Sequence, residues 1–384
     1  MGGGPDRENV LITLFDPEPK DTIAELKRRF PYFDITYVHV SVPTKGAKSN
    51  PTVISDELWK KTTILLTVFT LPPTPDLVPN LKLIHLFSAG IDGLANHPII
   101  KDTEIPLTTS SGIHGPPIAE WVILTTLVAS KHYLTQYEWQ KEHRWISNHP
   151  ELRATSDWVG KTVGIAGYGS IGRQVARIFS ALGSHVHAYT ASPRTTPESR
   201  IDTGYIVPGT GDPDGTIPRA WYSGTTKETL HTFLASGLDA LVIALPLTPA
   251  TRHLFGEEEF KILGGGGAGE GEGEASKEGN SDGKAGKRKG FLINLARGPL
   301  IDQPALVKAL NDEILAGAAV DVTEPEPLPE SDPLWEAKNV IITPHSSSLG
   351  VEYVSRAYDL FIENWGRKER GEKLFNLVDR KRGY

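Results

Sequence analysis

The chain has 384 residues, which is enough for two domains because a single core stops growing at about 250–300 residues. Its formal net charge of −7, from 40 basic and 47 acidic residues, argues against nucleic acid as the main partner. The absence of cysteine excludes disulfides, thiolate zinc sites and a cysteine nucleophile. No signal-peptide or membrane-spanning run is found, so we expect a cytoplasmic protein without a membrane partner.

The first hundred residues alternate between apolar runs typical of strands and amphipathic segments typical of helices. Strands are predicted at 10–15, 35–40, 63–69 and 83–87, and helices at 22–30 and 56–61, with Ser55 as the cap of the second helix. This alternation predicts a parallel sheet with helices on its faces. The region has no glycine-rich phosphate-binding motif, so we do not expect it to bind a dinucleotide.

The loop at 88–92 follows a predicted strand and lies where parallel sheets bind ligands. The backbone N–H groups of Ala89, Gly90 and Ile91 can hold a small carboxylate there. An ordinary strand-to-helix turn explains the same residues equally well.

A turn-rich stretch at 108–117 leads into a predicted helix at 118–131, with Pro116 and Pro117 suited to its first turn. We interpret this stretch as the first crossing between two domains. His114 lies in the hinge, where packing or solvation explains a histidine better than catalysis does.

The segment 137–158 places three tryptophans, Trp139, Trp145 and Trp158, among charged residues. Large aromatic side chains between polar ones are typical of interface anchors. We therefore interpret the segment as an arm that packs on a second subunit, which predicts a homodimer. The alternative is that the tryptophans pack within their own chain.

A glycine-rich motif joins a strand predicted at 162–166 to a helix whose apolar residues recur at three- and four-residue steps. Its glycines, Gly167, Gly169 and Gly172, have the spacing G-x-G-x-x-G. The first allows a tight turn, the second lets a pyrophosphate approach the backbone, and the third lets helix and strand pack closely.

The helix that follows the motif begins near Ser170 and Ile171, and its N-terminus offers N–H groups and partial positive charge to an anion. Glycine-rich turns are common, so the motif alone is weak evidence. Here it stands between a strand and a helix, with a second strand at 185–189, and this context predicts a dinucleotide site.

The rest of the chain continues the alternation of strands and helices. Strands are predicted at 238–245, 291–295, 317–322 and 340–343, and helices at 229–234, 257–263, 305–310 and 349–370. The turn-rich stretch 193–226 either covers the cofactor edge or is an insertion. Leu245 and Pro246, at the end of one strand, are expected to lie over the dinucleotide cleft.

The segment 264–290 interrupts this pattern with a composition rich in Gly, Glu and Lys and almost devoid of apolar residues. Such a composition is typical of a flexible surface insertion. Its basic end at 284–289 fits a solvated charge run better than a nuclear-localisation signal or a patch for an acidic partner.

These elements predict an α/β chain with two Rossmann-like or flavodoxin-like parallel-sheet domains and a cleft between them. Residues 1–115 together with 349–384 are expected to bind substrate, and residues 116–348 to bind the dinucleotide.

Three chemically useful side chains, Arg297, Glu326 and His345, follow three successive predicted strands. Because parallel strands end at one edge of a sheet, these side chains can converge. A guanidinium can grip a carboxylate in a fork, a histidine can move a proton near neutral pH, and a carboxylate behind the histidine fixes its tautomer. Each residue alone has an ordinary structural explanation, but together they supply what hydride transfer to a carbonyl requires.

The segments GYGSIG, ALPLTPATRHL, INLARGPLID, AAVDVTEPEPL and ITPHSSS resemble, in order, the signatures of the D-isomer-specific 2-hydroxyacid dehydrogenase family. The resemblance covers the chain from about Val10 to its end. It implies that Arg297 binds the substrate, that Glu326 rather than Glu324 pairs with the histidine, and that His345 is the general acid and base.

The resemblance also implies that Ala296 and Asp321 lie near the nicotinamide, and that the loop at 88–92 is the carboxylate-binding turn. It implies a dimer formed through an arm like 137–158. The expected reaction interconverts a small 2-keto acid and a D-2-hydroxy acid, with glyoxylate or hydroxypyruvate as fitting substrates, and no metal site is expected.

The end of the second strand of the dinucleotide unit departs from the family pattern. NAD-dependent relatives carry an acidic residue there, but this chain has Thr190, followed by Ser192 and Arg194. No carboxylate is present there to repel a 2′-phosphate, and the Arg194 guanidinium can pair with such a phosphate. Of the two cofactors, NADP(H) and NAD(H), we therefore expect NADP(H).

Two other readings remain open. The co-repressors called C-terminal binding proteins share this fold and triad, so a dinucleotide-sensing scaffold with weak or no turnover is the alternative; oxidation of NAD(P)H by 2-keto acids separates the two. A formate-dehydrogenase-like enzyme is disfavoured, because that group is expected to place glutamine where Glu326 stands.

Overall fold

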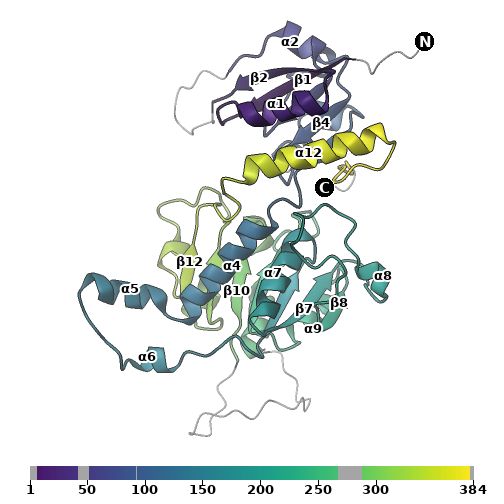
Figure 1. Cartoon of the computed structure of the whole chain (residues 1–384). Coiled ribbons are helices and arrows are strands. Elements are labelled where there is room, and N and C mark those ends of the chain that lie inside the picture. The colour runs from purple at the N-terminus through teal and green to yellow at the C-terminus, as the bar shows by residue number, and fades with distance from the viewer. Residues whose placement is uncertain (1–6, 42–51, 92, 267–287, 381–384) are drawn as a thin grey trace. The chain divides into compact units, whose positions relative to one another are not determined.

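The computed structural model describes residues 7–41, 52–91, 93–266 and 288–380 (Figure 1). The chain divides into two compact units, residues 1–113 with 350–384, and residues 114–349. Residues 267–287, which make up most of the predicted insertion, lie outside the described residues. Of the basic end predicted at 284–289, the structure describes Arg288 and Lys289. No helix among the described residues is long and apolar enough to cross a membrane.

The first unit contains a five-stranded parallel sheet in the order β2-β1-β3-β4-β5. Its strands are β1 (Glu8–Leu14), β2 (Phe33–His39), β3 (Ile64–Thr67), β4 (Leu83–Leu86) and β5 (Leu107–Thr109). Its helices are α1 (Lys20–Arg29), α2 (Asp56–Lys61), η1 (Pro75–Leu77), α3 (Pro98–Lys101) and α12 (Tyr353–Glu369). This strand order is that of flavodoxin-like sheets.

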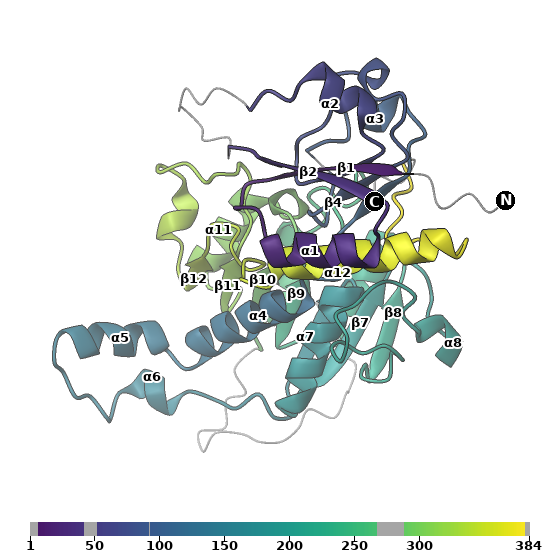
Figure 2. The same ribbon diagram turned by 45° about the horizontal axis from the view of Figure 1, so that its top comes forward.

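Local sequence explains most of these elements. The central strands β3 and β4 are buried along their whole length, as expected for parallel strands covered on both faces. The predicted cap of α2 is confirmed, because the Ser55 side chain accepts a hydrogen bond from the Leu58 amide at 3.3 Å. Helices α1 and α12 lie side by side (Figure 2).

Strand β5 was not predicted. It is only three residues long, it has the polar sequence Leu-Thr-Thr, and it lies at the start of the stretch interpreted as turn-rich. Pairing with β4 on one side and an antiparallel bridge from Thr108 to Leu377 on the other supply its order. Both contacts are distant in sequence, so local pattern could not indicate them.

The second unit contains a seven-stranded parallel sheet in the order β12-β11-β10-β9-β6-β7-β8. Its strands are β6 (Thr162–Ala166), β7 (His185–Thr190), β8 (Ala220–Ser223), β9 (Ala240–Ile243), β10 (Phe291–Asn294), β11 (Gly317–Val320) and β12 (Val340–Ile342). The strand order reverses between β6 and β9, which is the topological switch point where Rossmann-like sheets bind dinucleotides.

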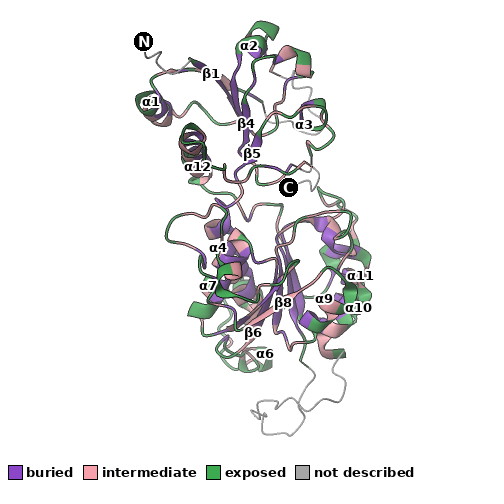
Figure 3. Cartoon of the chain, turned by 90° about the vertical axis from the view of Figure 1, so that its right-hand side faces the viewer, coloured by how far each residue is buried: buried purple, intermediate pink, exposed green. Residues whose placement is uncertain are grey.

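Helices cover both faces of this sheet, with α4 and α7 on one face and α9, α10 and α11 on the other (Figure 3). The helices of the unit are α4 (Gly115–Ser130), α5 (Tyr133–Lys141), α6 (Pro150–Arg153), α7 (Ser170–Ala181), α8 (Pro197–Arg200), α9 (Lys227–Leu234), α10 (Glu257–Lys261), η2 (Ile262–Gly266), η3 (Gly298–Leu300), α11 (Gln303–Asn311) and η4 (Pro333–Glu336). Side chains alternate between the two faces, so Val242 packs toward α4 and α7 while Ile243 packs toward α9 and α11.

Strand β8 lies within the stretch 193–226 that was interpreted as turn-rich. Its four residues pair with β7, from His187 opposite Ala220 to Thr190 opposite Ser223. All four side chains are only partly buried, because β8 is the edge strand of the sheet. An edge strand this short lacks the continuous apolar run from which the other strands were predicted.

The arm interpretation needs a correction at Trp158. This side chain is 7% exposed and belongs to the core between α7 and the sheet, with its ring 5.5 Å from that of Phe179 and its indole nitrogen 3.2 Å from Ser130 Oγ. Trp158 therefore packs within its own chain. Trp145, in contrast, is 96% exposed, and helices α5 and α6 project from the rest of the unit (Figures 1 and 2).

Candidate active site

The three side chains predicted to converge follow three neighbouring strands of the seven-stranded sheet. Arg297 follows β10, Glu326 follows β11 and His345 follows β12. His345 Nδ1 lies 2.6 Å from Glu326 Oε1, and the charge of Arg297 acts on the pKa values of both partners. The sheet thus brings together residues that are up to 48 positions apart in the chain (345 minus 297).

The histidine and the glutamate stabilise each other's charged forms. The hydrogen bond to Glu326 raises the pKa of His345 above its ordinary value, against an opposing effect of burial. The same hydrogen bond lowers the pKa of Glu326, and Arg297 lowers it further. Both side chains are a little over two-fifths exposed, so the pair is accessible to a substrate.

The backbone at His345 is in the left-handed region, with φ +53°, and Asp321 holds it there. The His345 amide donates to the Asp321 carbonyl at 2.8 Å. The Asp321 carboxylate, 1% exposed, accepts hydrogen bonds from the Thr343 hydroxyl at 2.5 Å and from the amides of Ser346 and Ser347 at 2.9 and 3.0 Å. Asp321, predicted to lie near the nicotinamide, thus orders the whole turn that carries the histidine.

The turn that carries Arg297 is ordered by a residue that the sequence did not single out. Asn294 is buried at the end of β10, where its side chain donates to the Arg297 carbonyl at 3.0 Å and accepts from the Ala296 amide at 3.2 Å. Arg297 Nη1 donates to the Ala296 carbonyl at 2.8 Å. Asparagine at a strand end is typical of such local side-chain-to-backbone turns.

Gly298 explains how the turns bearing Arg297 and Glu326 approach each other. A Cβ atom at this position would lie 2.0 Å from the Thr323 carbonyl oxygen, so no side chain fits. The Ala-Arg-Gly sequence at 296–298 therefore needs glycine as its third residue, because the two turns pack against each other at that position.

A second histidine–glutamate pair lies beside the first and was not predicted. His253 Nε2 is 2.6 Å from Glu324 Oε2, and the other oxygen of Glu324 pairs with Arg252. The Glu324 amide donates to Gln303 Oε1 at 3.0 Å. These contacts anchor the loop that carries Glu326 to the segment after β9 and to the start of α11.

The glycine motif forms a tight turn between β6 and α7 at the switch point of the sheet. Gly167 has φ +101°, and a Cβ there would lie 2.4 Å from the Ala244 carbonyl oxygen, while a Cβ at Gly172 would lie 2.2 Å from the Gly167 carbonyl oxygen. A Cβ at Gly169, by contrast, would meet no described atom within 4 Å. The turn is therefore packed tightly against the protein at Gly167 and Gly172, whereas space for another molecule remains at Gly169.

This geometry fits a dinucleotide. Gly169 is the N-cap of α7 and provides no side-chain cap, so the first N–H groups of the helix, near Ser170 and Ile171, remain for an anion. Leu245 and Pro246 follow β9, beside the turn, and Ala296 follows β10. Phosphates bind at helix N-termini of this kind.

The end of β7 places the residues considered for cofactor choice. Thr190 Oγ1 donates to the Ser192 carbonyl at 2.8 Å. Arg194 Nη1 donates to the Ser199 carbonyl of α8, and the Arg194 carbonyl accepts from Arg200 Nε at 3.0 Å. A guanidinium has five N–H groups, and the bond to Ser199 uses one of them.

The predicted carboxylate-binding turn lies in the first unit, directly after β4. Ser88 Oγ donates to the Gly90 carbonyl at 2.9 Å, and the Ile91 side chain is buried. Among the residues that the structure describes, the amides of Ala89, Gly90 and Ile91 donate no hydrogen bond. Asp92, the last residue of the predicted turn, lies outside the described residues.

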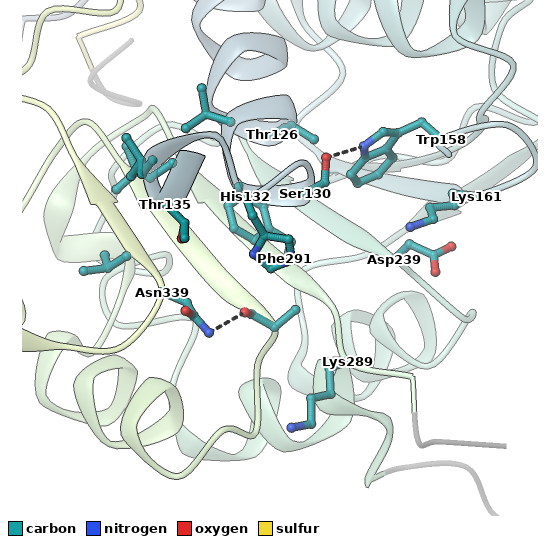
Figure 4. Close-up of a pocket in the computed structure, with 16 residues that line it drawn as sticks. Thr126, Ser130, His132, Thr135, Trp158, Lys161, Asp239, Lys289, Phe291 and Asn339 are labelled. Atoms are coloured by element: carbon teal, nitrogen blue, oxygen red, sulfur yellow. Dashed lines mark hydrogen bonds between the residues drawn. The ribbon is translucent and has the colours of Figure 1, made fainter. Parts of the chain in front are cut away.

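A cavity of about 340 Å³ lies at the opposite edge of the seven-stranded sheet, where the strands begin (Figure 4). Lys161 and Asp239 precede β6 and β9, Phe291 begins β10 and Asn339 precedes β12, and all four line the cavity. Burial lowers the pKa of Lys161. The cavity therefore lies at the opposite end of the strands from His345, and it is separate from the candidate active site.

One cluster has side chains typical of metal ligands, namely His231, Glu258 and Glu259. The Glu259 carboxylate already accepts hydrogen bonds from Lys227 Nζ at 2.8 Å, from His231 at 2.7 Å and from the Gly256 amide at 2.8 Å. These contacts make the cluster an ion-pair network that holds α9 against α10.

The chain is similar to known proteins of one enzyme family. The profile of the "D-isomer specific 2-hydroxyacid dehydrogenase, NAD binding domain" matches residues 123–206 and 283–347. A glyoxylate reductase from Korarchaeum cryptofilum is 27% identical over 305 residues, covering 79% of this chain and 78% of that protein. An uncharacterized protein in the proB 3′ region of Corynebacterium melassecola is 30% identical over 315 residues, covering 82% and 87%.

Solved structures show the same fold. A D-isomer specific 2-hydroxyacid dehydrogenase from Xanthobacter autotrophicus, in complex with NADPH and MES, has a TM-score of 0.68 and 26% identity and covers 97% of this chain and 99% of its own. A family member from Aeromonas salmonicida has a TM-score of 0.71 and 25% identity and covers 98% and 100%. The chain belongs to the D-isomer-specific 2-hydroxyacid dehydrogenase family, and is thus an oxidoreductase that acts on the CH–OH group with a nicotinamide dinucleotide.

Proposed function

We propose that the chain reduces a small 2-keto acid to the D-2-hydroxy acid, with His345 as general acid and base, Glu326 as its partner and Arg297 as the ligand of the substrate carboxylate. The observation that carries this proposal is the 2.6 Å His345–Glu326 contact beside Arg297, at the ends of three neighbouring strands. A proton donor, a carboxylate that stabilises its charged form and an anion-binding cation are the groups that the reaction requires.

In the reduction, His345 gives a proton to the carbonyl oxygen. Glu326 engages Nδ1, so Nε2 is the ring nitrogen left to face the substrate. The C=O electron pair moves to oxygen and takes this proton, while the carbonyl carbon gains a hydride. His345 is left neutral and recovers its proton from water, and Glu326 stabilises the imidazolium that re-forms.

When bound, the nicotinamide supplies the hydride in reduction and accepts it in oxidation. Gly167, Gly169 and Gly172 would hold the pyrophosphate at the N-terminus of α7. The turns that begin at Ala296 and Asp321 would border the nicotinamide. Asp321 also keeps His345 in place, since its carboxylate and carbonyl fix the turn on both sides of the histidine.

A small substrate, of the glyoxylate or hydroxypyruvate type, is favoured by the relatives. The Korarchaeum cryptofilum protein is named a glyoxylate reductase, and an Arabidopsis thaliana protein with 28% identity is named glyoxylate/hydroxypyruvate reductase A HPR2. The amides of Ala89, Gly90 and Ile91 offer a second set of donors for a carboxylate.

The test is turnover of NADPH and NADH with a panel of 2-keto acids that increase in size from glyoxylate. We expect the highest kcat/KM for glyoxylate or hydroxypyruvate. Oxidation of neither cofactor by any acid of the panel would contradict the proposal and favour the dinucleotide-sensing scaffold. A preference for bulky aromatic keto acids would contradict only the substrate class.

We further propose that NADP(H) is the preferred cofactor. Thr190 and Ser192 leave the end of β7 without a carboxylate, and Arg194, held by α8, can pair with a 2′-phosphate. Replacement of Arg194 by Ala should lower kcat/KM with NADPH by roughly tenfold and leave kcat/KM with NADH unchanged. A wild-type preference for NADH that R194A does not alter would contradict this assignment.

We also propose a homodimer formed through the α5–α6 arm. Tyr133, Leu134, Tyr137 and Trp145 expose large apolar surfaces on one projecting segment, with Trp145 96% exposed. Exposed aromatic clusters of this kind mark interfaces. Light scattering should give twice the mass of the chain, and Trp145→Asp should shift the protein toward monomer. A monomeric wild type would contradict the arm's role. The cytoplasmic location stays a prediction from sequence.

A further inference from the structure

The loop 201–219, which connects α8 to β8, contacts the glycine turn directly. The Tyr168 hydroxyl, from the position between Gly167 and Gly169, donates a hydrogen bond to Asp212 Oδ2 at 2.7 Å. Tyr168 is 5% exposed and Asp212 is 4% exposed, so the bond is shielded from water. A hydrogen bond from a phenol to a buried carboxylate is among the stronger kinds in proteins.

The backbone of the loop itself fixes the Asp212 carboxylate. Its Oδ1 accepts from the Thr216 amide at 3.0 Å, and its Oδ2 accepts from the Ile217 amide at 3.1 Å as well as from Tyr168. The Asp212 carboxylate is therefore held in place by its own loop, independently of Tyr168. The contact between the two side chains thus positions the tyrosine. Burial and the Asp212 carboxylate both raise the pKa of Tyr168, so the phenol stays protonated and donates.

Further contacts tie the same loop to the first turns of α7. The Arg173 guanidinium, 3% exposed, donates to the carbonyls of Asp212 and Arg200, and its Nε lies 3.4 Å from Asp202. The Gly211 amide donates to Gln174 Oε1 at 2.6 Å. The loop thus reaches the glycine turn from one side and the helix that follows it from another.

Ordering the glycine turn carries a high cost in conformational entropy. Glycine loses more conformational freedom on ordering than any other residue, and two of the three residues at 167–169 are glycine. Tyr168 has the only side chain between them. Its ring contacts the Arg173 guanidinium, 5.1 Å away, and the Trp221 ring, 5.0 Å away, and its hydroxyl is bound to Asp212.

We propose that the loop 201–219 acts as a clamp on the glycine turn, in which Asp212 holds Tyr168 so that the turn is already shaped for the pyrophosphate before the dinucleotide binds. This role makes Tyr168 and Asp212 positioning residues for cofactor affinity. Ordering a flexible turn at the moment of binding costs affinity, and an ordered turn avoids this cost. The inference rests on the dinucleotide site described above and on no assignment of the keto acid.

The test compares Tyr168→Phe and Asp212→Asn with the wild type in binding of NADPH, followed by its fluorescence, and of adenosine, followed by competition. Adenosine lacks the pyrophosphate and should not sense the glycine turn. We expect both variants to raise the Kd for NADPH by about fivefold or more, the effect of one buried hydrogen bond to a charged group. The Kd for adenosine should stay unchanged.

Tyr189→Phe is the matched control. Tyr189 is 4% exposed and its hydroxyl donates to the Gly224 carbonyl at 2.9 Å, so this variant also loses one phenol hydrogen bond, to a neutral acceptor and on the other face of the sheet. It should leave the Kd values of both ligands unchanged. An unaltered Kd for NADPH in folded Tyr168→Phe, or parallel weakening of NADPH and adenosine, would overturn the clamp. If Asp212→Asn does not fold, Tyr168→Phe decides the question. Because no keto acid is present, a wrong substrate assignment would leave the result intact.

Discussion

Two neighbouring histidine–glutamate pairs, His345–Glu326 and His253–Glu324, are alike in most local measures. In each, a ring nitrogen lies 2.6 Å from a carboxylate oxygen. Both histidines have left-handed backbones, with φ +53° and +49°, and both are nearly half exposed. The two glutamates are two residues apart in one loop. A close histidine–carboxylate contact alone therefore does not identify a general acid.

The second partners of the glutamates distinguish the pairs. The other oxygen of Glu324 pairs with Arg252, so its charge is already balanced within the loop anchor. Glu326 instead acts on His345, whose pKa it raises, and Arg297 is the nearby cation. His253 also uses Nε2 for the contact, whereas His345 uses Nδ1 and leaves Nε2 for a substrate. The comparison predicts that one pair is catalytic and the other structural.

The largest effect is expected for His345→Ala. Loss of the general acid should lower kcat by about 10²- to 10⁴-fold, with the Kd for the dinucleotide unchanged, because the proton moves only in the transition state. His253→Ala is the matched control and should lower kcat far less. Steady-state kinetics and cofactor titration of both variants are the measurements. Equal losses in the two variants would remove the distinction between the pairs.

A smaller loss is expected for Arg297→Lys, which keeps the positive charge but not the planar fork. The substrate carboxylate should lose its bidentate contact, so KM should rise and kcat/KM should fall by about 100-fold. Arg252→Lys, in the structural pair, should change kcat/KM little. If Arg297→Lys behaved like wild type, a role in gripping the carboxylate would be untenable.

Glu326→Gln should change the pH dependence more than the maximal rate. Without the carboxylate the pKa of His345 should fall, because the hydrogen bond to Glu326 is the main cause of its increase. Reduction needs protonated His345, so kcat/KM for the keto acid should begin to decline at a lower pH than in the wild type. Oxidation needs neutral His345 and should extend to lower pH. Glu324→Gln should leave both profiles in place, and a shift there instead would reverse the assignment.

The sequence was sufficient to predict that the side chains of the proposed site come together. Arg297 and His345 each follow a predicted parallel strand, and because such strands end at one edge of a sheet, the two side chains could be expected to lie together. The sequence could not predict the contacts that hold the turns of the site in place. Asn294 bonds to the backbone of the turn that carries Arg297, and Glu324 pairs with Arg252, a residue 72 positions away. Strand pattern gave no means of recognising such contacts.

Similar reasons explain the errors elsewhere. Strands β5 and β8 are short and form through pairing with distant segments, so they lack a continuous apolar run of their own. Trp158, like the exposed Trp145, directly follows a charged residue and precedes a β-branched apolar one, but it packs on Phe179, a contact that only the tertiary fold provides. The hydrogen bond between Tyr168 and Asp212 joins residues that are 44 positions apart, and Asp212 lies in the stretch that was interpreted as turn-rich. The sequence pattern therefore could not predict this contact.

The smallest effect on activity is expected at a third histidine, His85, which sharpens the comparison because its partners are uncharged. It is fully buried in the first unit, with Nδ1 2.8 Å from Thr108 Oγ1 and Nε2 3.3 Å from Ser110 Oγ. Burial lowers its pKa to about 3. Replacement by glutamine should therefore leave the pH profile of catalysis unchanged and alter only stability.

The sign of that stability effect follows from the direction of the shift. Below about pH 6.5 the unfolded chain protonates His85 while the folded chain does not, so stability falls on acidification, by about 1.6 kcal/mol from pH 6.5 to pH 5. His85→Gln should lose this part of the decline in urea unfolding at the two pH values, whereas His143→Gln, at an exposed position, should keep it. A decline unchanged in His85→Gln would mean that His85 is protonated within the fold, and the contrast with His345, which rests on a charged partner, would then fail.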